Sequence, residues 1–201
     1  MLEIVLATAN PGKIAEILEI MDGLPVSFIT KDQTPPWPEI VEDGDTYLDN
    51  ALIKARALVG LTGKAAIADD SGIEIDALDG APGVRSARFA GPAATDDQNN
   101  ARMAELLAGV PDEWRTARYR CVTVLLLPNG TQFIGEGTCE GRIALAPRGT
   151  NGFGYDPWFV PDEQEGTLTF GELPLDFKHG ISHRGKALRQ LAGRLHRSDI
   201  Y

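Results

Sequence analysis

The stretch EIVLATANPGK, residues 3–13, predicts the first structural unit of the chain. Its first five residues, Glu3–Ala7, are mostly apolar, as expected for a short buried strand. Asn10 then supplies a helix N-cap, and Pro11 occupies the favoured first helical position. The apolar residues that follow recur at helical spacing until Gly23 ends the run. A strand followed at once by a helix indicates an α/β fold.

Further elements extend outward from this unit without a strict strand–helix–strand repeat. We predict helices over 46–59 and 95–107 and a last helix from about Ser182. The predicted strands cover 26–30, 64–69, 73–77, 116–127, 132–138 and 141–146, with a hairpin turn at Asn129-Gly130. The segment Asp69–Gly72 is expected to break the extended chain. Hairpins dominate the second half, so the predicted fold class is α/β, with a mixed β-sheet flanked by helices.

The composition limits the classes of function. The 201 residues suit one domain, and 29 acidic against 19 basic side chains give a net charge of −10. Such a surface repels a phosphate backbone, so we expect no nucleic acid partner. No run approaches the roughly 18–20 apolar residues of a membrane span, and the first residues lack a signal-peptide pattern. We therefore expect no membrane association and a cytoplasmic location. The two cysteines, Cys121 and Cys139, are not spaced as a zinc site.

The junction Thr8–Lys13 is the first candidate site. A helix start offers free N–H groups and a positive dipole end, Gly12 permits close approach, and Lys13 adds a full charge. The sequence is not a Walker A loop, which requires GxxxxGK[ST]. A phosphate site and a plain capped turn with a surface lysine therefore both fit this segment.

Acidic residues form the second candidate site. Asp69 and Asp70 are adjacent at a strand end, so their side chains should point to opposite faces. One carboxylate can then serve a metal ion and a water molecule while the other has a structural role. A second acidic group, Glu42, Asp43 and Asp45, precedes a helix on which Asn50 and Lys54 share a face. Turn chemistry and solvated surface charge are the alternative interpretations.

Two further segments carry candidate residues. The glycine-rich loop 149–157 surrounds Phe153, which can stack on a flat ligand or be buried in the core. Lys178 precedes Ser182-His183-Arg184, where Ser182 would cap the last helix and place two donors on its first turn. An arginine in a first turn opposes the helix dipole, which argues against a purely structural role for it.

Taken together, these segments resemble the inosine/xanthosine triphosphate pyrophosphatase family. The matching motifs are Thr8-x-Asn10-x-x-Lys13, Ile67–Gly72, Gly80–Gly83, Ser86–Phe89, Gly152–Pro157 and Ser182–Arg184. The resemblance extends from about Leu2 to Leu195. It implies an elongated mixed sheet with two lobes around a central cleft, one two-lobed domain over residues 1–201, and a homodimer. The implied reaction is Mg²⁺-dependent hydrolysis of ITP, dITP or XTP to the monophosphate and pyrophosphate.

The resemblance also implies a role for each matching position. Asp70 would be the catalytic carboxylate that activates water and binds Mg²⁺. Glu42 would be a second metal ligand, for which its neighbour Asp43 could substitute, and Ser71 would contact substrate. The triphosphate would be held by Thr8, Ala9, Asn10, Pro11, Gly12, Lys13 and Lys54. The base would be surrounded by Phe153, Gly154, Tyr155, Asp156, Lys178, His183 and Arg184, with Phe153 stacked on it.

A few positions depart from the family's usual wording. Ala9 and Asn151 stand where glycine is common, and the segment Phe177–Gly180 is less polar than expected, which affects the assignment of Lys178. Three rival functions remain to be separated: a Maf-like pyrophosphatase for modified pyrimidines, a non-catalytic nucleotide-binding protein, and a nucleic-acid-binding module. The Ser182–Arg184 block disfavours the Maf-like pyrophosphatase. The presence of Asp70 and Lys13 disfavours a non-catalytic protein, and the acidic net charge disfavours a nucleic-acid-binding module.

Overall fold

The computed structural model describes residues 1–38 and 40–198 and contains one six-stranded sheet in the order β2-β1-β3-β4-β5-β6. β1 runs parallel to both β2 and β3, whereas β5 and β6 are antiparallel, so the predicted α/β fold with a mixed sheet is confirmed. The strands are β1 (Leu2–Leu6), β2 (Val26–Ile29), β3 (Ala65–Ile75), β4 (Thr116–Leu126), β5 (Gln132–Ile143) and β6 (Phe159–Pro161).

The chain divides into two compact units. Unit 1 comprises residues 1–70, 121–137 and 184–201, and unit 2 comprises residues 71–120 and 138–183. Strands β3, β4 and β5 therefore contribute residues to both units. The chain crosses between the units four times, after residues 70, 120, 137 and 183.

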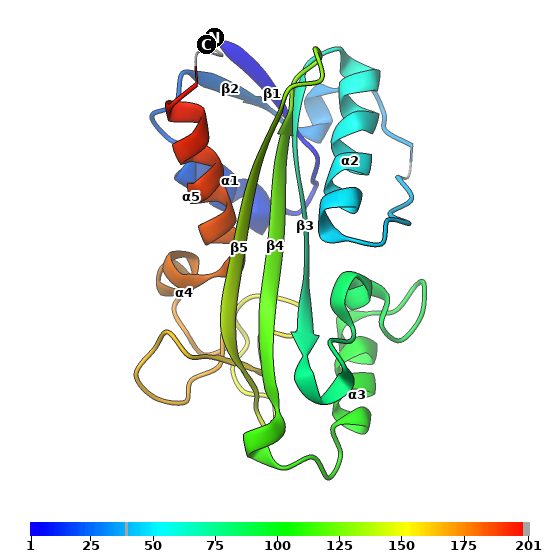
Figure 1. Ribbon diagram of the computed structural model, residues 1–201, viewed down its shortest axis with the longest axis vertical. Helices are drawn as coiled ribbons and strands as arrows, with labels where there is room; N and C mark the ends of the chain where they lie inside the picture. Colours follow the sequence, from blue (N-terminus) through cyan, green and yellow to red (C-terminus); the bar gives the residue numbers. More distant parts are fainter. Residues whose placement is uncertain (39, 199–201) are drawn as a thin grey trace. The chain divides into compact units, whose positions relative to one another are not determined.

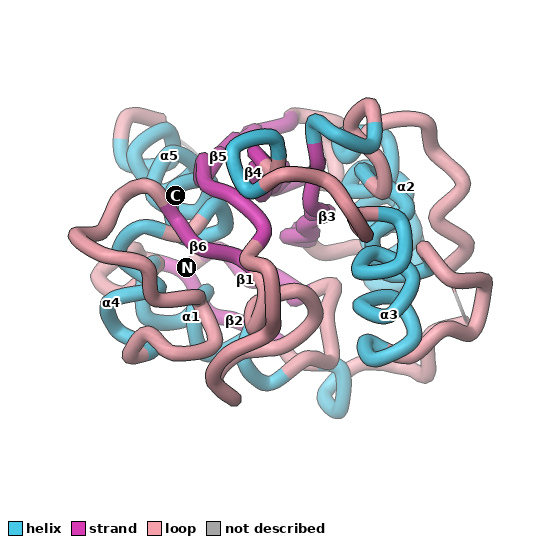
Figure 2. Tube along the Cα trace, turned by 90° about the horizontal axis from the view of Figure 1, so that it is seen from below, coloured by secondary structure: helices cyan, strands magenta, loops and turns pink. Residues whose placement is uncertain are grey.

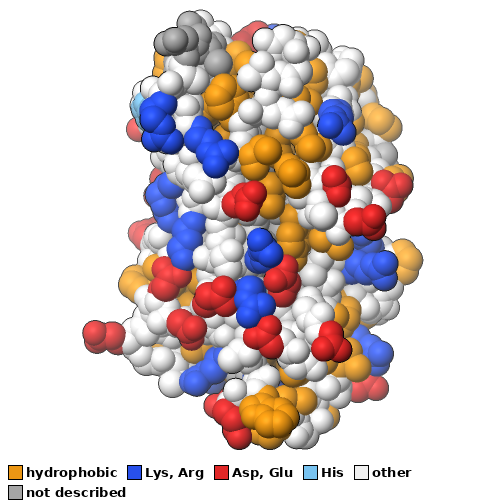
Figure 3. All heavy atoms as spheres, viewed as in Figure 1, with side chains coloured by type: hydrophobic (Ala, Val, Ile, Leu, Met, Phe, Trp, Pro, Cys, Tyr) orange, Lys and Arg blue, Asp and Glu red, His pale blue; other side chains and the backbone are white. Residues whose placement is uncertain are grey.

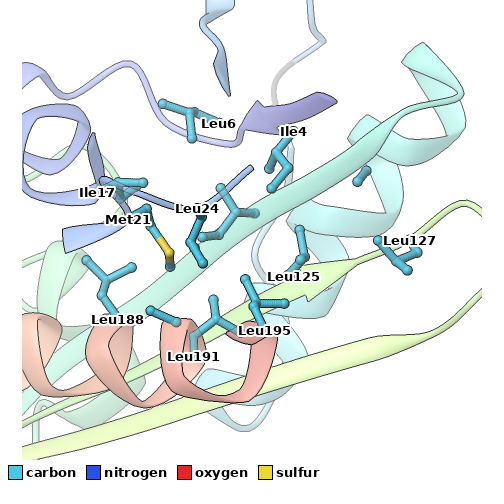
Figure 4. Close-up of a cluster of buried hydrophobic side chains, with 13 residues drawn as sticks. Ile4, Leu6, Ile17, Met21, Leu24, Leu125, Leu127, Leu188, Leu191 and Leu195 are labelled. Carbon is cyan, nitrogen blue, oxygen red and sulfur yellow. The ribbon is translucent and has the colours of Figure 1, made fainter. Parts of the chain in front are cut away.

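Unit 1 is a layered α/β structure whose strands bury both faces (Figure 1). Ile4 and Leu6 of β1 pack in a cluster with helices α1 (Pro11–Ile20) and α5 (His183–His196). Val5, between them, packs with Leu58 of helix α2 (Tyr47–Thr62) on the other face. This two-residue alternation is the geometry of a strand, and Figure 4 shows the larger of the two clusters.

Local signals set the ends of these helices. The side chain of Asn10 accepts hydrogen bonds from the amides of Gly12 and Lys13, and Pro11 follows in the first turn, as the sequence predicts. Thr46 caps α2 through the amide of Asp49. At the other end of α2, Gly63 adopts the left-handed conformation with φ 66°, which ends the helix.

Unit 2 has its own core, centred on the large aromatic side chains Tyr119, Phe159 and Phe170. Helix α3 (Asp96–Leu106) contributes the fully buried Met103, and α4 (Leu175–Ile181) lies shortly before α5. The chain before and after β6 is mostly loop, as Figure 2 shows. Aromatic contacts therefore take the place of regular secondary structure in holding this part of unit 2 together.

Charged side chains cover one face of unit 2. Arg118 on β4 donates hydrogen bonds to Asp76 at 2.9 Å and to Glu140 on β5 at 3.0 Å. Its hydrogen bond holds the pKa of Asp76 below the usual value. Figure 3 shows acidic and basic side chains interspersed over the lower parts of β4 and β5. Opposite charges on neighbouring strands stabilise their pairing by roughly 0.2–1 kcal/mol each.

Several elements differ from the sequence prediction, and strand β6 (Phe159–Pro161) is one that the sequence pattern did not reveal. The expected break at Asp69–Gly72 is wrong, because β3 continues through it to Ile75. The two strands predicted over 132–146 are a single strand, β5, that ends at Ile143. Helix α4 is not predicted by the helical pattern because it is short and contains Gly180. In the described residues, no helix has the length and apolar character needed to span a membrane.

Gly135 tests the packing of β5 against α5. A Cβ atom there would lie 2.1 Å from the carbonyl oxygen of Ala187 and 2.9 Å from the amide of Leu191, both backbone atoms. We expect Gly135→Ala to lower the free energy of unfolding by about 1–3 kcal/mol. Gly60→Ala is the matched control, since its Cβ would meet open space within α2. It should raise stability by up to about 1 kcal/mol in chemical denaturation; equal losses in both variants would contradict this account.

Candidate functional site

The predicted site residues fall into a group in unit 1 and a group in unit 2, each of which we describe by itself. In unit 1, β3 directs Asp69 and Asp70 to opposite faces, as the alternation of a strand requires. Asp69 bonds residues of α1 and α5, and Asp70 bonds a residue of α2. The predicted division of the two carboxylates between two faces is therefore confirmed.

Asp69 is the centre of a buried ion network. Its Oδ2 accepts from Lys13 Nζ at 2.9 Å and from Arg184 Nε at 3.2 Å. Arg184 also lies 3.6 Å from a carboxylate oxygen of Glu16, and Asp69, Arg184 and Glu16 are each at most 5% exposed. Burial alone would raise the pKa of Asp69, but the charges of Lys13, Arg184 and Lys54 hold it well below the usual value. Asp69 is therefore a permanent anion that fixes two cations.

The junction Thr8–Lys13 is a closed capping structure. Asn10 Oδ1 accepts from the amides of Gly12 at 2.9 Å and Lys13 at 3.2 Å, while Thr8 Oγ1 accepts from the amide of Asn10. Ala9, Pro11 and Gly12 are exposed around it. Two of the N–H groups expected to be free for an anion are thus bonded to Asn10. The cationic group at this junction is the ammonium of Lys13.

The opposite face of β3 carries a second charged group. Lys54 Nζ lies 2.9 Å from Glu42 Oε2 and 3.9 Å from Asp70 Oδ1. Burial by itself would lower the pKa of Lys54, but the carboxylates of Asp69, Asp70 and Glu42 raise it overall. Asn50 Nδ2 donates to Asp70 Oδ2 at 3.0 Å. Of the two alternatives for the second carboxylate, Glu42 is the one bonded to Lys54, and Asp43 is exposed.

Glu42 and Asp70 are the carboxylates of this group that a metal ion could reach together. Over residues 1–38 and 40–198 there is no cluster of three or more His, Cys, Asp or Glu side chains arranged to hold a metal. Mg²⁺ is commonly bound in proteins by one or two carboxylates, with waters and substrate phosphates completing the shell. Glu42 and Asp70 carry carboxylate oxygens of the kind that Mg²⁺ prefers, and the ammonium of Lys54 lies between them.

In unit 2, Asp156 organises the glycine-rich loop. Its Oδ2 accepts from Lys178 Nζ at 2.6 Å and from the amide of Phe153 at 2.8 Å. Tyr119 Oη lies 3.4 Å from its other oxygen. Asp156 is only 3% exposed, so its carboxylate is used to hold the loop. Gly152 is required beside it, because φ is 77° and a Cβ would lie 2.0 Å from Asp156 Oδ2.

Helix α3 fixes the same loop from another side. The amide of Gly154 donates to Asp96 at 2.8 Å, and its carbonyl accepts from Asn100 at 3.0 Å. Tyr155 is buried and donates to the carbonyl of Ser86 at 2.8 Å. Between these anchors Phe153 is 45% exposed, with Lys178 Nζ 5.4 Å from its ring centroid. The loop thus presents an aromatic ring on a rigid frame.

His183 and Arg184, adjacent in sequence, belong to different groups. His183 is buried in unit 2 and stacks on Tyr119, with ring centroids 4.6 Å apart and planes within 6° of parallel. Arg184 bonds Asp69 and Glu16 in unit 1. Ser71, the first residue of unit 2, is half-buried on β3. The last helix begins at His183, as predicted from Ser182.

Comparison with known proteins shows the family to which the chain belongs. A profile of the Ham1 family matches residues 4–194, nearly the whole chain. The chain belongs to the Ham1 family. Its Ham1 relatives include a dITP/XTP pyrophosphatase of Geobacter sulfurreducens, 47% identical over 195 residues and 97% of each chain. Another, from Nitratidesulfovibrio vulgaris, is 50% identical and covers 94% of this chain and 93% of its own.

Solved Ham1 structures share the fold. A HAM1 protein from Coxiella burnetii superposes with a TM-score of 0.90 at 44% identity, covering 98% of this chain and 100% of its own. The Ham1 protein of Staphylococcus aureus gives a TM-score of 0.86 at 35% identity, with 97% and 98% covered.

Each of the two groups also contains a residue to which the sequence patterns assigned no role. Glu16 precedes the apolar Ile17 on α1, and only its i, i+3 spacing from Lys13 marks it. Asn50 is marked by its i, i+4 spacing from Lys54, which does not reveal its bond to Asp70. Tyr119 carries no sequence signal, because it is one aromatic among the alternating residues of β4.

The two adjacent carboxylates should differ in their effect on stability. Asp69→Asn leaves Lys13 and Arg184 without their shared anion, and breaking a buried ion pair costs about 3–5 kcal/mol. Asp70→Asn keeps an oxygen that accepts from Asn50, so we expect a change of about 1 kcal/mol or less. Urea denaturation of both variants at neutral pH measures the difference. Equal destabilisation would show that Asp69 is not the structural member of the pair.

Proposed function

We propose that this Ham1-family protein hydrolyses deaminated purine nucleoside triphosphates (ITP, dITP and XTP) to the monophosphate and pyrophosphate. The relatives named dITP/XTP pyrophosphatase support this reaction. The observation that carries the proposal is the group around Lys54, in which Glu42 and Asp70 approach one ammonium. Two carboxylates beside a buried lysine suit a triphosphate and its metal ion. Residues 1–201 act as one pyrophosphatase domain in this proposal.

Mg²⁺ is the proposed metal, with Glu42 and Asp70 as its protein ligands. When bound, it would neutralise phosphate charge and favour in-line attack by water. Asp70 would also accept the proton of that water. Lys54 would exchange its carboxylate partners for phosphate oxygens. These cations offset the repulsion between a triphosphate and a protein of net charge −10.

Phosphate binding at the first junction rests on Lys13. Asp69 tethers its ammonium, so the side chain is held in place before substrate arrives. Thr8 and Asn10 would contribute polar atoms beside it, and the exposed residues Ala9, Pro11 and Gly12 would border the phosphates. Arg184, expected from sequence to read the base, is bonded to Asp69. We propose that it positions Asp69, and through it Lys13.

The base would be bound by the unit 2 group. Phe153 offers an exposed ring for stacking, on the loop fixed by Gly154, Tyr155 and Asp156. Lys178 is bonded to Asp156 and supports that loop, and Ser71 would contact substrate. His183 would donate a hydrogen bond to the 6-oxo group of hypoxanthine or xanthine. Adenine presents a donor there, so the proposed hydrogen bond from His183 is not formed, at a cost of about 1–3 kcal/mol.

Assembly and location are further parts of the proposal. A homodimer is proposed from the resemblance noted in the sequence. A cytoplasmic location follows from the proposed substrates, which arise in the nucleotide pool. Nucleic acid and membranes are not proposed as partners, because the net charge of −10 disfavours anionic surfaces.

A nucleotide panel tests the reaction. Pyrophosphate release is measured with Mg²⁺ and with ITP, XTP, dITP, ATP, GTP and modified pyrimidine triphosphates. We expect ITP, dITP and XTP to be preferred, and Asp70→Asn to lower kcat by about 10²–10⁴. Preference for the modified pyrimidines would indicate a Maf-like activity. Binding of ITP without turnover by the wild type would indicate a non-catalytic nucleotide-binding protein.

Base choice is tested with ITP and ATP as a pair. His183→Ala should lower kcat/KM for ITP far more than for ATP, because only the 6-oxo purine gains its donor. Phe153→Ala should lower kcat/KM for ITP and for ATP by the same factor, since every base has a face that can stack on the ring. Arg184→Ala should also lower kcat/KM for both substrates by the same factor, because the variant loses the hydrogen bond from residue 184 to Asp69. An ITP-selective loss in Arg184→Ala would show that Arg184 reads the base, as the sequence resemblance implied.

A further inference from the structure

Asn50 lies on the first turn of α2 and is 1% exposed. Both polar atoms of its carboxamide form hydrogen bonds. Nδ2 donates to Asp70 Oδ2 at 3.0 Å, and Oδ1 accepts from the amide of Gly44 at 2.9 Å. One side chain thus joins three segments of unit 1: the end of the acidic loop, helix α2 and strand β3.

Gly44 shows how closely the loop approaches α2. A Cβ atom at this position would lie 2.6 Å from Asp49 Cβ and 2.9 Å from Asn50 Oδ1. Only glycine allows the backbone to come close enough for its amide to reach Asn50. Glu42 is two residues earlier on the same loop, and its carboxylate bonds Lys54, one turn further along α2. The loop that carries Glu42 is therefore held to the helix at two points.

The carboxamide suits this position chemically. Asp70 needs a donor, and the amide of Gly44 needs an acceptor. A carboxylate at residue 50 would place a second negative charge beside Asp70, and an ammonium would offer no acceptor to Gly44. Asparagine supplies one donor and one acceptor on a short neutral side chain. It can therefore orient the carboxylate of Asp70 without neutralising it.

We propose that Asn50 is a positioning residue that sets the placement of Asp70 relative to the loop of Glu42, and thereby the affinity of the site for its divalent cation. The inference rests on the proposed function, in which these two carboxylates are the metal ligands. Groups that orient metal ligands typically change metal affinity or activity by 10–100-fold when they are removed. The competing explanation is that Asn50 only fastens a loop to a helix.

Asn99 is a matched control for that competing explanation. It also lies on the first turn of a helix, α3, and is 2% exposed. Its Oδ1 accepts from the amide of Ala90 at 2.8 Å, and its Nδ2 donates to the carbonyl of Ala87 at 3.1 Å. Both of its partners are backbone groups. Asn99 therefore fastens a loop to a helix without contacting a carboxylate.

The experiment compares Asn50→Leu with Asn99→Leu, which remove both hydrogen bonds while keeping side-chain volume. Mn²⁺ alone is titrated into each protein without nucleotide and followed by electron paramagnetic resonance. Thermal unfolding, the Mg²⁺ concentration for half-maximal ITP turnover, and KM for ITP at saturating Mg²⁺ are also measured. We expect both variants to lose thermal stability, but only Asn50→Leu to bind Mn²⁺ at least about 10-fold more weakly. Its Mg²⁺ requirement should rise in parallel, with a smaller change in KM.

Wild-type Mn²⁺ affinity in a folded Asn50→Leu variant would overturn the inference. An equal loss of Mn²⁺ affinity in Asn99→Leu would also overturn it, since the effect would then be general destabilisation. Asn50→Ser, a smaller polar replacement, serves if Asn50→Leu does not fold. The proposed metal site is tested separately by Asp70→Asn and Glu42→Gln. If neither weakens Mn²⁺ binding relative to wild type, the site itself fails and the inference falls with it.

Discussion

The buried carboxylate of Asp69 is the charge around which unit 1 is organised. It binds Lys13 from α1 and Arg184 from α5, so one anion joins the central strand to two helices on the same face. A buried charge is costly unless it is paired, and each member of this group depends on the others for its compensation. Glu16 adds a second carboxylate for the second cation. The cost of burial thereby fixes the geometry of Lys13, the cation proposed to meet phosphate.

Side chains alternate between the two faces of β3, and this places the structural carboxylate and the proposed catalytic carboxylate on opposite faces. Asp69 faces the α1 and α5 side, whereas Asp70, one residue later, faces α2. Two adjacent acids would repel each other strongly on one surface, but each here has hydrogen-bond donors of its own: Lys13 and Arg184 for Asp69, and Asn50 for Asp70. The charge of Lys54 stabilises both carboxylates. The proposed catalytic carboxylate can therefore exchange its partners for a metal ion while its neighbour stays fixed.

In unit 2, hydrogen bonds around a loop keep an aromatic side chain exposed to solvent, and the ring is not buried in the core. Asp156 and Lys178 form a buried pair beneath the loop, and α3 bonds both backbone groups of Gly154. Phe153 consequently keeps 45% of its surface exposed although the loop around it is tightly bonded. Preorganisation of this kind would lower the entropy lost on binding of the base that we propose stacks on the ring.

The sequence by itself determined the features that depend on neighbouring residues. Four features follow from local geometry: the alternation of side chains along strands, the Asn10 cap, the start of α5 at His183, and the opposite directions of Asp69 and Asp70. Motif wording also indicated the family. Only the tertiary structure decided which charges pair, since Lys13 and Arg184 lie 56 and 115 residues from Asp69 along the chain. It likewise decided that β3 continues past Asp70, because pairing within a sheet overrides the turn preference of Asp-Ser-Gly. Local periodicity carries no information about such distant partners, and burial then makes those pairings obligatory.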